Sequence, residues 1–317
     1  MPPRWPRILI GLAALAGLAC AQQGAAPQQA PSYLIRLNVG EVLVQTNVLD
    51  KKGRSITTLP ASDFTVYENG VQQTVKSFSH DDAPVSVGIL VDNSGSMRPR
   101  RIQVDQAALN FVRASNPQDE VFIAKFNDIY RLVAPFTNSI PALEKGLGEV
   151  DPESSTALYD AVINSVHYMN QHATRTKRVL LLITDGQDDA SSHSLEQTLR
   201  LLASQDAPLI YCIGIFDRSD GRSTRRASEK VLLQFADDTG GVAYFPKNLN
   251  QVDAITKKVA QDIRLQYSLV YRSNQTTPGY RTIRLEVKDP HLKHLTAHTR
   301  RGYLPSGGGG KPGGSEQ

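Results

Sequence analysis

The segment Val85–Val91 constrains the fold of this chain more than any other. It reads Val-Ser-Val-Gly-Ile-Leu-Val, a nearly continuous apolar run with no regular polar alternation. Such a run is typical of a strand buried on both faces of a parallel sheet. Because parallel strands need crossover connections, usually helices, we expect the chain beyond this strand to alternate between strands and helices.

The sequence after this strand shows that alternation. Apolar periodicity predicts strands at 121–126, 130–136, 178–183, 209–215 and 242–245, and helices at 100–114, 139–148, 157–171, 193–204, 227–238 and 249–264. The predicted fold class is α/β, with a doubly wound, mostly parallel sheet that carries helices on both faces. We assign this domain to residues 84–264.

The segments 33–82 and 265–304 have a different pattern, because their apolar and polar residues alternate with a period of two. Asn69-Gly70 is a typical hairpin turn between two such stretches. Neither segment is long enough for an independent core. We therefore expect the two to form one small β-sandwich, into which the α/β domain is inserted. Two separate β modules that flank the domain are the alternative.

Residues 1–21 have the pattern of a signal peptide. Arg4 and Arg7 precede an apolar run, Ile8–Ala19, which is too short to span a bilayer and ends at a small-x-small cleavage pattern. The prediction is an exported protein, which is periplasmic, secreted or held at the cell surface. A short membrane anchor and lipidation of Cys20 are the alternatives.

The remaining composition is that of a globular chain, with 40% hydrophobic and 21% charged residues. The net charge of +4 is small and dispersed, without the basic stripe that nucleic-acid binding requires. After signal removal Cys212 stands alone in an apolar run, so we expect a buried structural thiol. The linker at 22–32 and the Gly-rich tail at 305–317 have the composition of segments without fixed structure.

Oxygen-bearing side chains follow the predicted buried strand. Asp92, Ser94 and Ser96 are spaced so that one tight loop can direct three oxygens to one point. Asp185 follows a second predicted strand, and Thr156, after two serines, precedes a predicted helix. Loops at the carboxyl edge of a parallel sheet are where ligands bind. We therefore expect these five side chains to form a cation site.

Carboxylates and hydroxyls together fit a hard cation. Mg²⁺ prefers oxygen ligands, keeps several waters and usually takes one or two carboxylates. Asp92 and Asp185 would neutralise it, while the neutral hydroxyls leave it able to accept one more anionic oxygen. We therefore predict Mg²⁺ as the cofactor, and a partner protein that presents Asp or Glu. Mn²⁺ is an alternative, and Ca²⁺ fits less well.

The same residues carry a family resemblance. Asp-x-Ser-x-Ser after a buried strand, Thr156 in Thr-Ala-Leu-Tyr-Asp-Ala, and Thr-Asp-Gly186 are similar to the von Willebrand factor type A (VWA) domain with its metal-ion-dependent adhesion site (MIDAS). The flanks resemble a bacterial exported subfamily. The resemblance implies that Ser94, Ser96 and Thr156 bind the ion directly or through water, and that Asp92 and Asp185 often act through water. Ser155 stands where many relatives have Gly.

Nearby polar residues have simpler interpretations. We expect Asp188 and Asp189 to lie at a solvated helix start, with a second ion site as the alternative, and Asp160 to be a surface or capping residue. The seven histidines share no spacing with the acids, so we expect ordinary surface histidines.

A binding module without enzymatic activity is the favoured function. The sequence has no nucleophile elbow around Ser94 and no Gly-rich phosphate loop. A structural envelope scaffold with a stabilising ion is one alternative, and a metal-dependent hydrolase or phosphatase is another. The resemblance also implies a movement, because in related adhesion proteins ligation at the metal shifts the terminal helix. Since the helix at 249–264 leads directly into the next strand, such a shift could be transmitted to the β strands.

Overall fold

The computed structural model describes residues 40–148, 155–216, 221–275 and 278–305. The predicted signal peptide and linker lie outside these residues, and so does the C-terminal tail after residue 305. Ser154 of the predicted Thr156 loop is also outside them.

A six-stranded sheet forms the centre of the described α/β region, in the order β10-β9-β8-β5-β6-β7. The strands are β5 (Val85–Asp92), β6 (Glu120–Phe126), β7 (Tyr130–Thr137), β8 (Lys177–Thr184), β9 (Leu209–Gly214) and β10 (Ala243–Tyr244). Parallel pairing runs from β10 through to β6. The predicted mostly parallel α/β fold is therefore confirmed.

Strand β7 is the exception, because it pairs with β6 in the antiparallel direction. Only residues 127–129 separate the two strands. A link of that length allows a hairpin but no crossover, which needs a dozen residues or more. The short connection therefore determines the direction of this edge strand.

Strand β5 is buried along its whole length, as its apolar run predicted. Successive side chains point to opposite faces. Val87 and Ile89 pack in one core cluster with residues of α1 and α6, and Leu90 packs in the other with residues of α3 and α5. At Gly88, a Cβ atom would lie 2.4 Å from the Phe122 ring, so glycine is required for that ring to pack.

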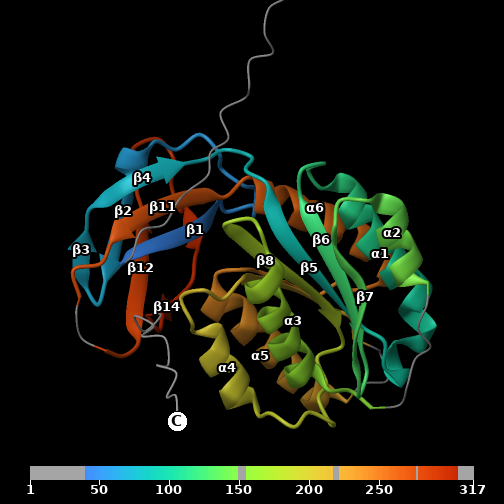
Figure 1. The fold of residues 1–317 in the computed structure, drawn as a ribbon. Helices are drawn as coiled ribbons and strands as arrows, with labels where there is room; N and C mark the ends of the chain where they lie inside the picture. Colours follow the sequence, from blue (N-terminus) through green and yellow to red (C-terminus); the bar gives the residue numbers. More distant parts are fainter. Residues whose placement is uncertain (1–39, 149–154, 217–220, 276–277, 306–317) are drawn as a thin grey trace, which may run out of the picture. The chain divides into compact units, whose positions relative to one another are not determined.

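Helices cover both faces of the sheet. They are α1 (Arg101–Ala114), α2 (Ile140–Leu147), α3 (Leu158–His172), α4 (Leu195–Leu202), α5 (Arg222–Thr239) and α6 (Val252–Arg264). Helix α1 contacts α2 and α6 on one face, and α4 contacts α3 and α5 on the other (Figure 1). Short 3₁₀ turns, η2 (Gly95–Arg100) and η3 (Leu249–Gln251), precede α1 and α6.

Strands from both sides of the α/β region form two further four-stranded sheets, with the orders β13-β1-β11-β4 and β14-β12-β2-β3. The strands before it are β1 (Glu41–Leu49), β2 (Phe64–Glu68), β3 (Val71–Gln73) and β4 (Val75–Ser79). Those after it are β11 (Tyr267–Arg272), β12 (Arg281–Val287), β13 (Thr296–His298) and β14 (Gly302–Tyr303). A third core cluster contains residues of both sheets.

Antiparallel pairing of β1 with β11 and of β2 with β12 joins segments far apart in the sequence. The stretch 71–78, which follows the Asn69-Gly70 turn and has the period of a strand, is divided at Thr74, because β3 pairs within one sheet and β4 within the other. The short strands β13 and β14 carry too few residues for a period to be recognised.

The end of α6 is held by side chains from both regions. Asp262 accepts hydrogen bonds from the Ser55 hydroxyl (3.0 Å) and the Tyr244 hydroxyl (2.7 Å), and it pairs with Lys258 (2.9 Å). Gln266 donates to the buried Tyr211 hydroxyl, which also accepts from Asn47 of β1. We call residues 262–266 and these partners the junction.

Candidate metal centre

Asp92 ends β5 and is buried, with 2% of its surface exposed. Its Oδ1 accepts the backbone N–H of Ser94 at 2.9 Å, and its Oδ2 accepts the Thr184 hydroxyl at 2.6 Å. Neither donor carries a charge. Burial, together with the nearby charge of Asp185, raises the pKa of Asp92 to about 6. The carboxylate therefore lies where a cation would relieve an electrostatic cost.

Asp185 follows β8 and is 1% exposed. Its Oδ2 accepts the Ser96 hydroxyl at 2.6 Å, and the Ser94 and Ser96 hydroxyl oxygens lie 3.1 Å apart. Ser94 is buried, whereas Ser96 is exposed. These contacts, with the Thr184 bridge to Asp92, bring four of the five predicted residues together at the carboxyl edge of neighbouring strands.

Thr156 reaches this edge through the backbone. Its N–H donates to Asp189 Oδ1 at 2.7 Å, and the N–H of Ala157 donates to the Asn127 carbonyl at 2.7 Å. The preceding carbonyl, that of Phe126, accepts the N–H of Asn93. The end of β6 thus holds both loops. Among the described residues, no hydrogen bond joins the Thr156 hydroxyl to the other four side chains.

Asp188 and Asp189 do not begin the helix that follows them in the sequence, because α4 begins at Leu195 after the Ser194 cap. Asp188 Oδ1 accepts the N–H of Tyr159 at 3.2 Å, in the first turn of α3, and Asp189 holds Thr156. Both aspartates therefore satisfy backbone donors at the start of α3, where a negative charge is favourable. This role could not be predicted from the sequence, because both aspartates are distant from Thr156 along the chain.

Asp160 caps a loop, in agreement with its expected surface or capping role. It accepts the backbone N–H groups of Ser192 and His193 and the His193 ring at 2.7 Å. Cys212 is buried in β9, where burial raises the pKa of its thiol, so its side chain is structural.

The five side chains fit a hard cation by their chemistry. No three His, Cys, Asp or Glu side chains gather as a metal site within the described residues. A site at this edge would therefore combine two carboxylates with hydroxyls, a donor set that suits Mg²⁺ better than a transition metal. Thr184 and Asn127, which orient Asp92 and the Thr156 loop, were not assigned roles from the sequence.

Comparison with known families identifies the domain that contains these residues. A family model described as von Willebrand factor type A domain matches residues 87–187, a range that contains all five side chains. No curated protein matches the chain.

Solved structures with the same fold come from a bacterium and a mollusc. A von Willebrand factor type A protein from Catenulispora acidiphila is 13% identical with a TM-score of 0.50, over 75% of this chain and 73% of that one. Proximal thread matrix protein 1 from the mussel byssus, solved with a zinc-occupied MIDAS motif, is 17% identical with a TM-score of 0.50. That match covers 63% of this chain and 50% of the mussel protein. At these identities the likeness shows the fold alone.

Proposed function

Because this chain contains a von Willebrand factor type A domain, we propose that it is an exported protein-binding or adhesion module without enzymatic activity. A divalent cation at the carboxyl edge of the sheet binds an acidic group of a partner protein. Ser94, Ser96 and Thr156 would supply hydroxyl oxygens, and Asp92 and Asp185 the carboxylates. Mg²⁺ is the proposed ion, with Mn²⁺ as the alternative.

One observation carries the proposal: Asp92 and Asp185 are both buried at neighbouring strand ends, and the hydrogen-bond donors to Asp92 are uncharged. Within the described ranges no Lys or Arg side chain pairs with either carboxylate, so their burial is costly, and an ion with charge +2 would neutralise them. The bound ion would supply positive charge, and the neutral hydroxyls leave that charge available to a further carboxylate. Ser96 is exposed, so a partner can approach from its side.

The hydroxyl environment supports binding over hydrolysis. Ser94 contacts Ser96, and Ser96 donates to Asp185. A serine nucleophile needs an adjacent base that can take its proton, usually a histidine held by a third group. Within the described residues, neither serine has a histidine partner.

Apolar side chains beside the metal loops support a protein partner. Ile102, two residues after η2, is 82% exposed, and Ile129, two residues after Asn127, is 51% exposed. An exposed apolar side chain beside a polar site is a common feature of protein interfaces. A partner that places an acid on the ion can cover these residues.

Export rests on the signal-peptide pattern of residues 1–21. Of the helices in the described ranges, none combines the length and apolarity needed to cross a membrane.

The test combines ion binding with partner capture. Mg²⁺ is titrated into the full chain and into Asp92→Ala by calorimetry, and both are used to capture proteins from envelope extract with Mg²⁺ or EDTA. We expect Asp92→Ala to lose both ion binding and Mg²⁺-dependent capture. Asp128→Ala, an exposed aspartate at the same edge, is the control and should retain both.

Capture that survives EDTA and Asp92→Ala unchanged would refute the proposal. An ion that raises the melting temperature without affecting capture would indicate a structural role.

A further inference from the structure

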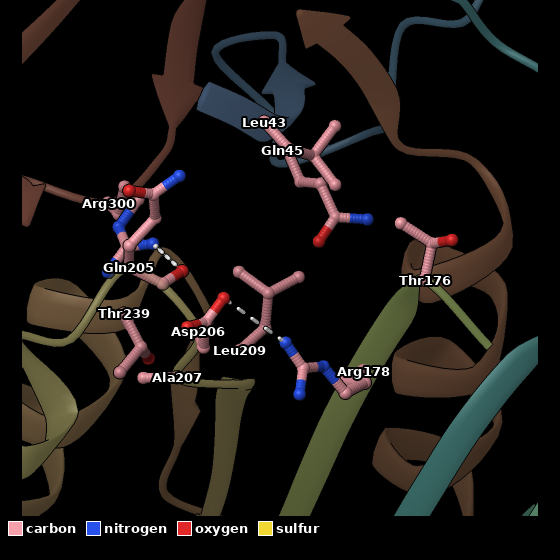
Figure 2. Close-up of a pocket in the computed structure, with 10 residues that line it drawn as sticks. All are labelled: Leu43, Gln45, Thr176, Arg178, Gln205, Asp206, Ala207, Leu209, Thr239 and Arg300. Carbon is pink, nitrogen blue, oxygen red and sulfur yellow. Dashed lines mark hydrogen bonds and ion pairs between the residues drawn. The ribbon is translucent and has the colours of Figure 1, made fainter. Parts of the chain in front are cut away.

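A cavity lies at the opposite edge of the central sheet from the metal loops (Figure 2). Its volume is about 60 Å³. Thr176 and Arg178 line it at the start of β8, whereas Asp185 follows the end of that strand. Eight residues of strand separate the two places by about 25 Å. Gln45 of β1 and Arg300 before β14 complete the cavity from the flanking sheets.

Arg300 brings a buried positive charge to this cavity. It is 7% exposed, and its guanidinium donates to three main-chain carbonyls, those of Gly302 (3.1 Å), Gln205 (3.0 Å) and Ser204 (2.8 Å). These carbonyls satisfy hydrogen bonds but carry no net charge. Burial lowers the pKa of this arginine, which reflects the cost of keeping the charge there.

Arg178 brings a second positive charge. Its Nη1 donates to the Asn170 side chain at 2.8 Å, and its Nη2 lies 3.9 Å from Asp206 Oδ1. The Asp206 side chain is 58% exposed, so solvent screens this single carboxylate. Two guanidinium groups thus face one solvated acid, which leaves the cavity with an excess of positive charge.

Gln45 adds an uncharged polar group. Its side-chain amide points into the space between β1 and β8 (Figure 2). Within the described part of the chain, this amide has no hydrogen-bond partner. Leu43 and Leu209 supply apolar wall. The cavity would hold about four water molecules, which is the size of an acetate ion.

We propose that this cavity is a binding site for a small monocarboxylate, with Arg178 and Gln45 as its direct ligands and Arg300 as a charge behind them. The walls come from β1 and the residue 300 segment on one side, and from β8 and residues 205–209 on the other. A bound carboxylate would therefore contact both regions and stabilise their packing.

The test uses the full chain in EDTA, so that acetate cannot bind through a cation at the metal loops. Sodium acetate is titrated against sodium chloride at constant ionic strength, and binding is followed by melting temperature and by NMR of ¹³C-labelled acetate. We expect acetate, but not chloride, to raise the melting temperature and to show saturable binding. Benzoate, which exceeds the cavity in size, should not bind.

Variants locate the site. Arg178→Gln should weaken acetate binding at least tenfold, and Gln45→Leu should weaken it several-fold. Arg200→Gln, an exposed arginine of α4, is the matched control and should bind as the wild type does. Asp92→Ala should also retain acetate binding, which separates this site from the metal loops. If the acetate effect is no larger than that of chloride, or survives both Arg178→Gln and Gln45→Leu, the cavity holds water alone and the proposal is wrong.

Discussion

The buried carboxylates at the two ends of the central sheet have different partners. At the junction, Asp262 is buried but receives two hydroxyl donors and the ammonium group of Lys258. At the carboxyl edge, Asp92 is equally buried, yet its donors within the described residues are a backbone N–H and hydroxyls, all uncharged, and Asp185 lies nearby. The first carboxylate is neutralised by the protein. The second has no charged donor among the described residues, which is the observation behind the proposed cation site.

The largest expected effect lies at the junction. Asp262→Ala should lower the free energy of unfolding by about 3 kcal/mol, because it leaves the hydroxyls of Ser55 and Tyr244 without their acceptor and Lys258 without its partner. Urea unfolding of the full chain in EDTA measures this. Asp253→Ala, on the exposed side of the same helix, should cost about 1 kcal/mol or less. Equal losses for the two variants would contradict the role given to Asp262.

In EDTA, Asp92→Asn should stabilise the protein, whereas Asp262→Ala destabilises it. Replacing one of two neighbouring buried carboxylates with a neutral amide keeps the oxygen that accepts from Ser94, and should raise the free energy of unfolding by about 1–2 kcal/mol. Mg²⁺ should then stabilise the wild type but not the variant. Thermal unfolding with and without Mg²⁺ measures both effects. If the variant is destabilised and still responds to Mg²⁺, Asp92 is not the uncompensated charge at the carboxyl edge, and the contrast with Asp262 is wrong.

Lys177, which contacts the junction, should make the stability of the protein depend on pH. Burial lowers the pKa of this lysine from 10.5 to about 7, although Asp119 and Asp82 oppose the shift, and its Nζ donates to the Ile263 carbonyl at the junction. Between these two pH values the unfolded chain binds the proton more tightly, so stability should rise as pH increases from about 7 towards 10.5.

Lys177→Met should remove that rise, and should stabilise the protein by about 1 kcal/mol at neutral pH. Urea unfolding at several pH values, compared with the exposed variant Lys288→Met, measures the difference. A wild-type slope that persists in Lys177→Met would show that another group titrates.

The smallest expected effect concerns transmission along α6. If metal occupancy moves this helix, the movement must overcome contacts that hold its C-terminal end. His80 contacts the Leu265 carbonyl at 3.0 Å, and Arg264 pairs with Asp82. We expect Mg²⁺ to slow hydrogen exchange in the loops at 92–96 and 185–190 and to leave residues 262–271 unchanged. A Mg²⁺-dependent change in 262–271 would instead support transmission to the β strands.

Much of the α/β fold could be predicted because its signals are local. The buried run of β5 and the strand-helix alternation predicted the mostly parallel sheet, and Asp92, Ser94 and Ser96 are close enough in sequence to be recognised as one loop. The direction of β7 also depends on a local feature, the three-residue link before it, but a strand pattern alone does not report direction.

The contacts that could not be predicted join distant segments. Asp189 and Thr156, or Asp262 and Ser55, meet only after the sheet and its helices have formed. The division of 71–78 between two sheets has the same origin, because pairing partners on both sides of the α/β region select each half.

The sequence by itself therefore determined the type of fold and the chemistry of the candidate metal loops, since periodicity and short spacing are properties of the chain. Tertiary structure decided which carboxylates are buried and which distant groups surround them. Lys258 stands four residues before Asp262 on the same helix, so that ion pair is local. The hydroxyls of Ser55 and Tyr244 reach Asp262, and the charge of Asp185 reaches Asp92, only through packing. The cost of a buried charge depends on all of its neighbours in space, and many of these come from distant segments of the chain.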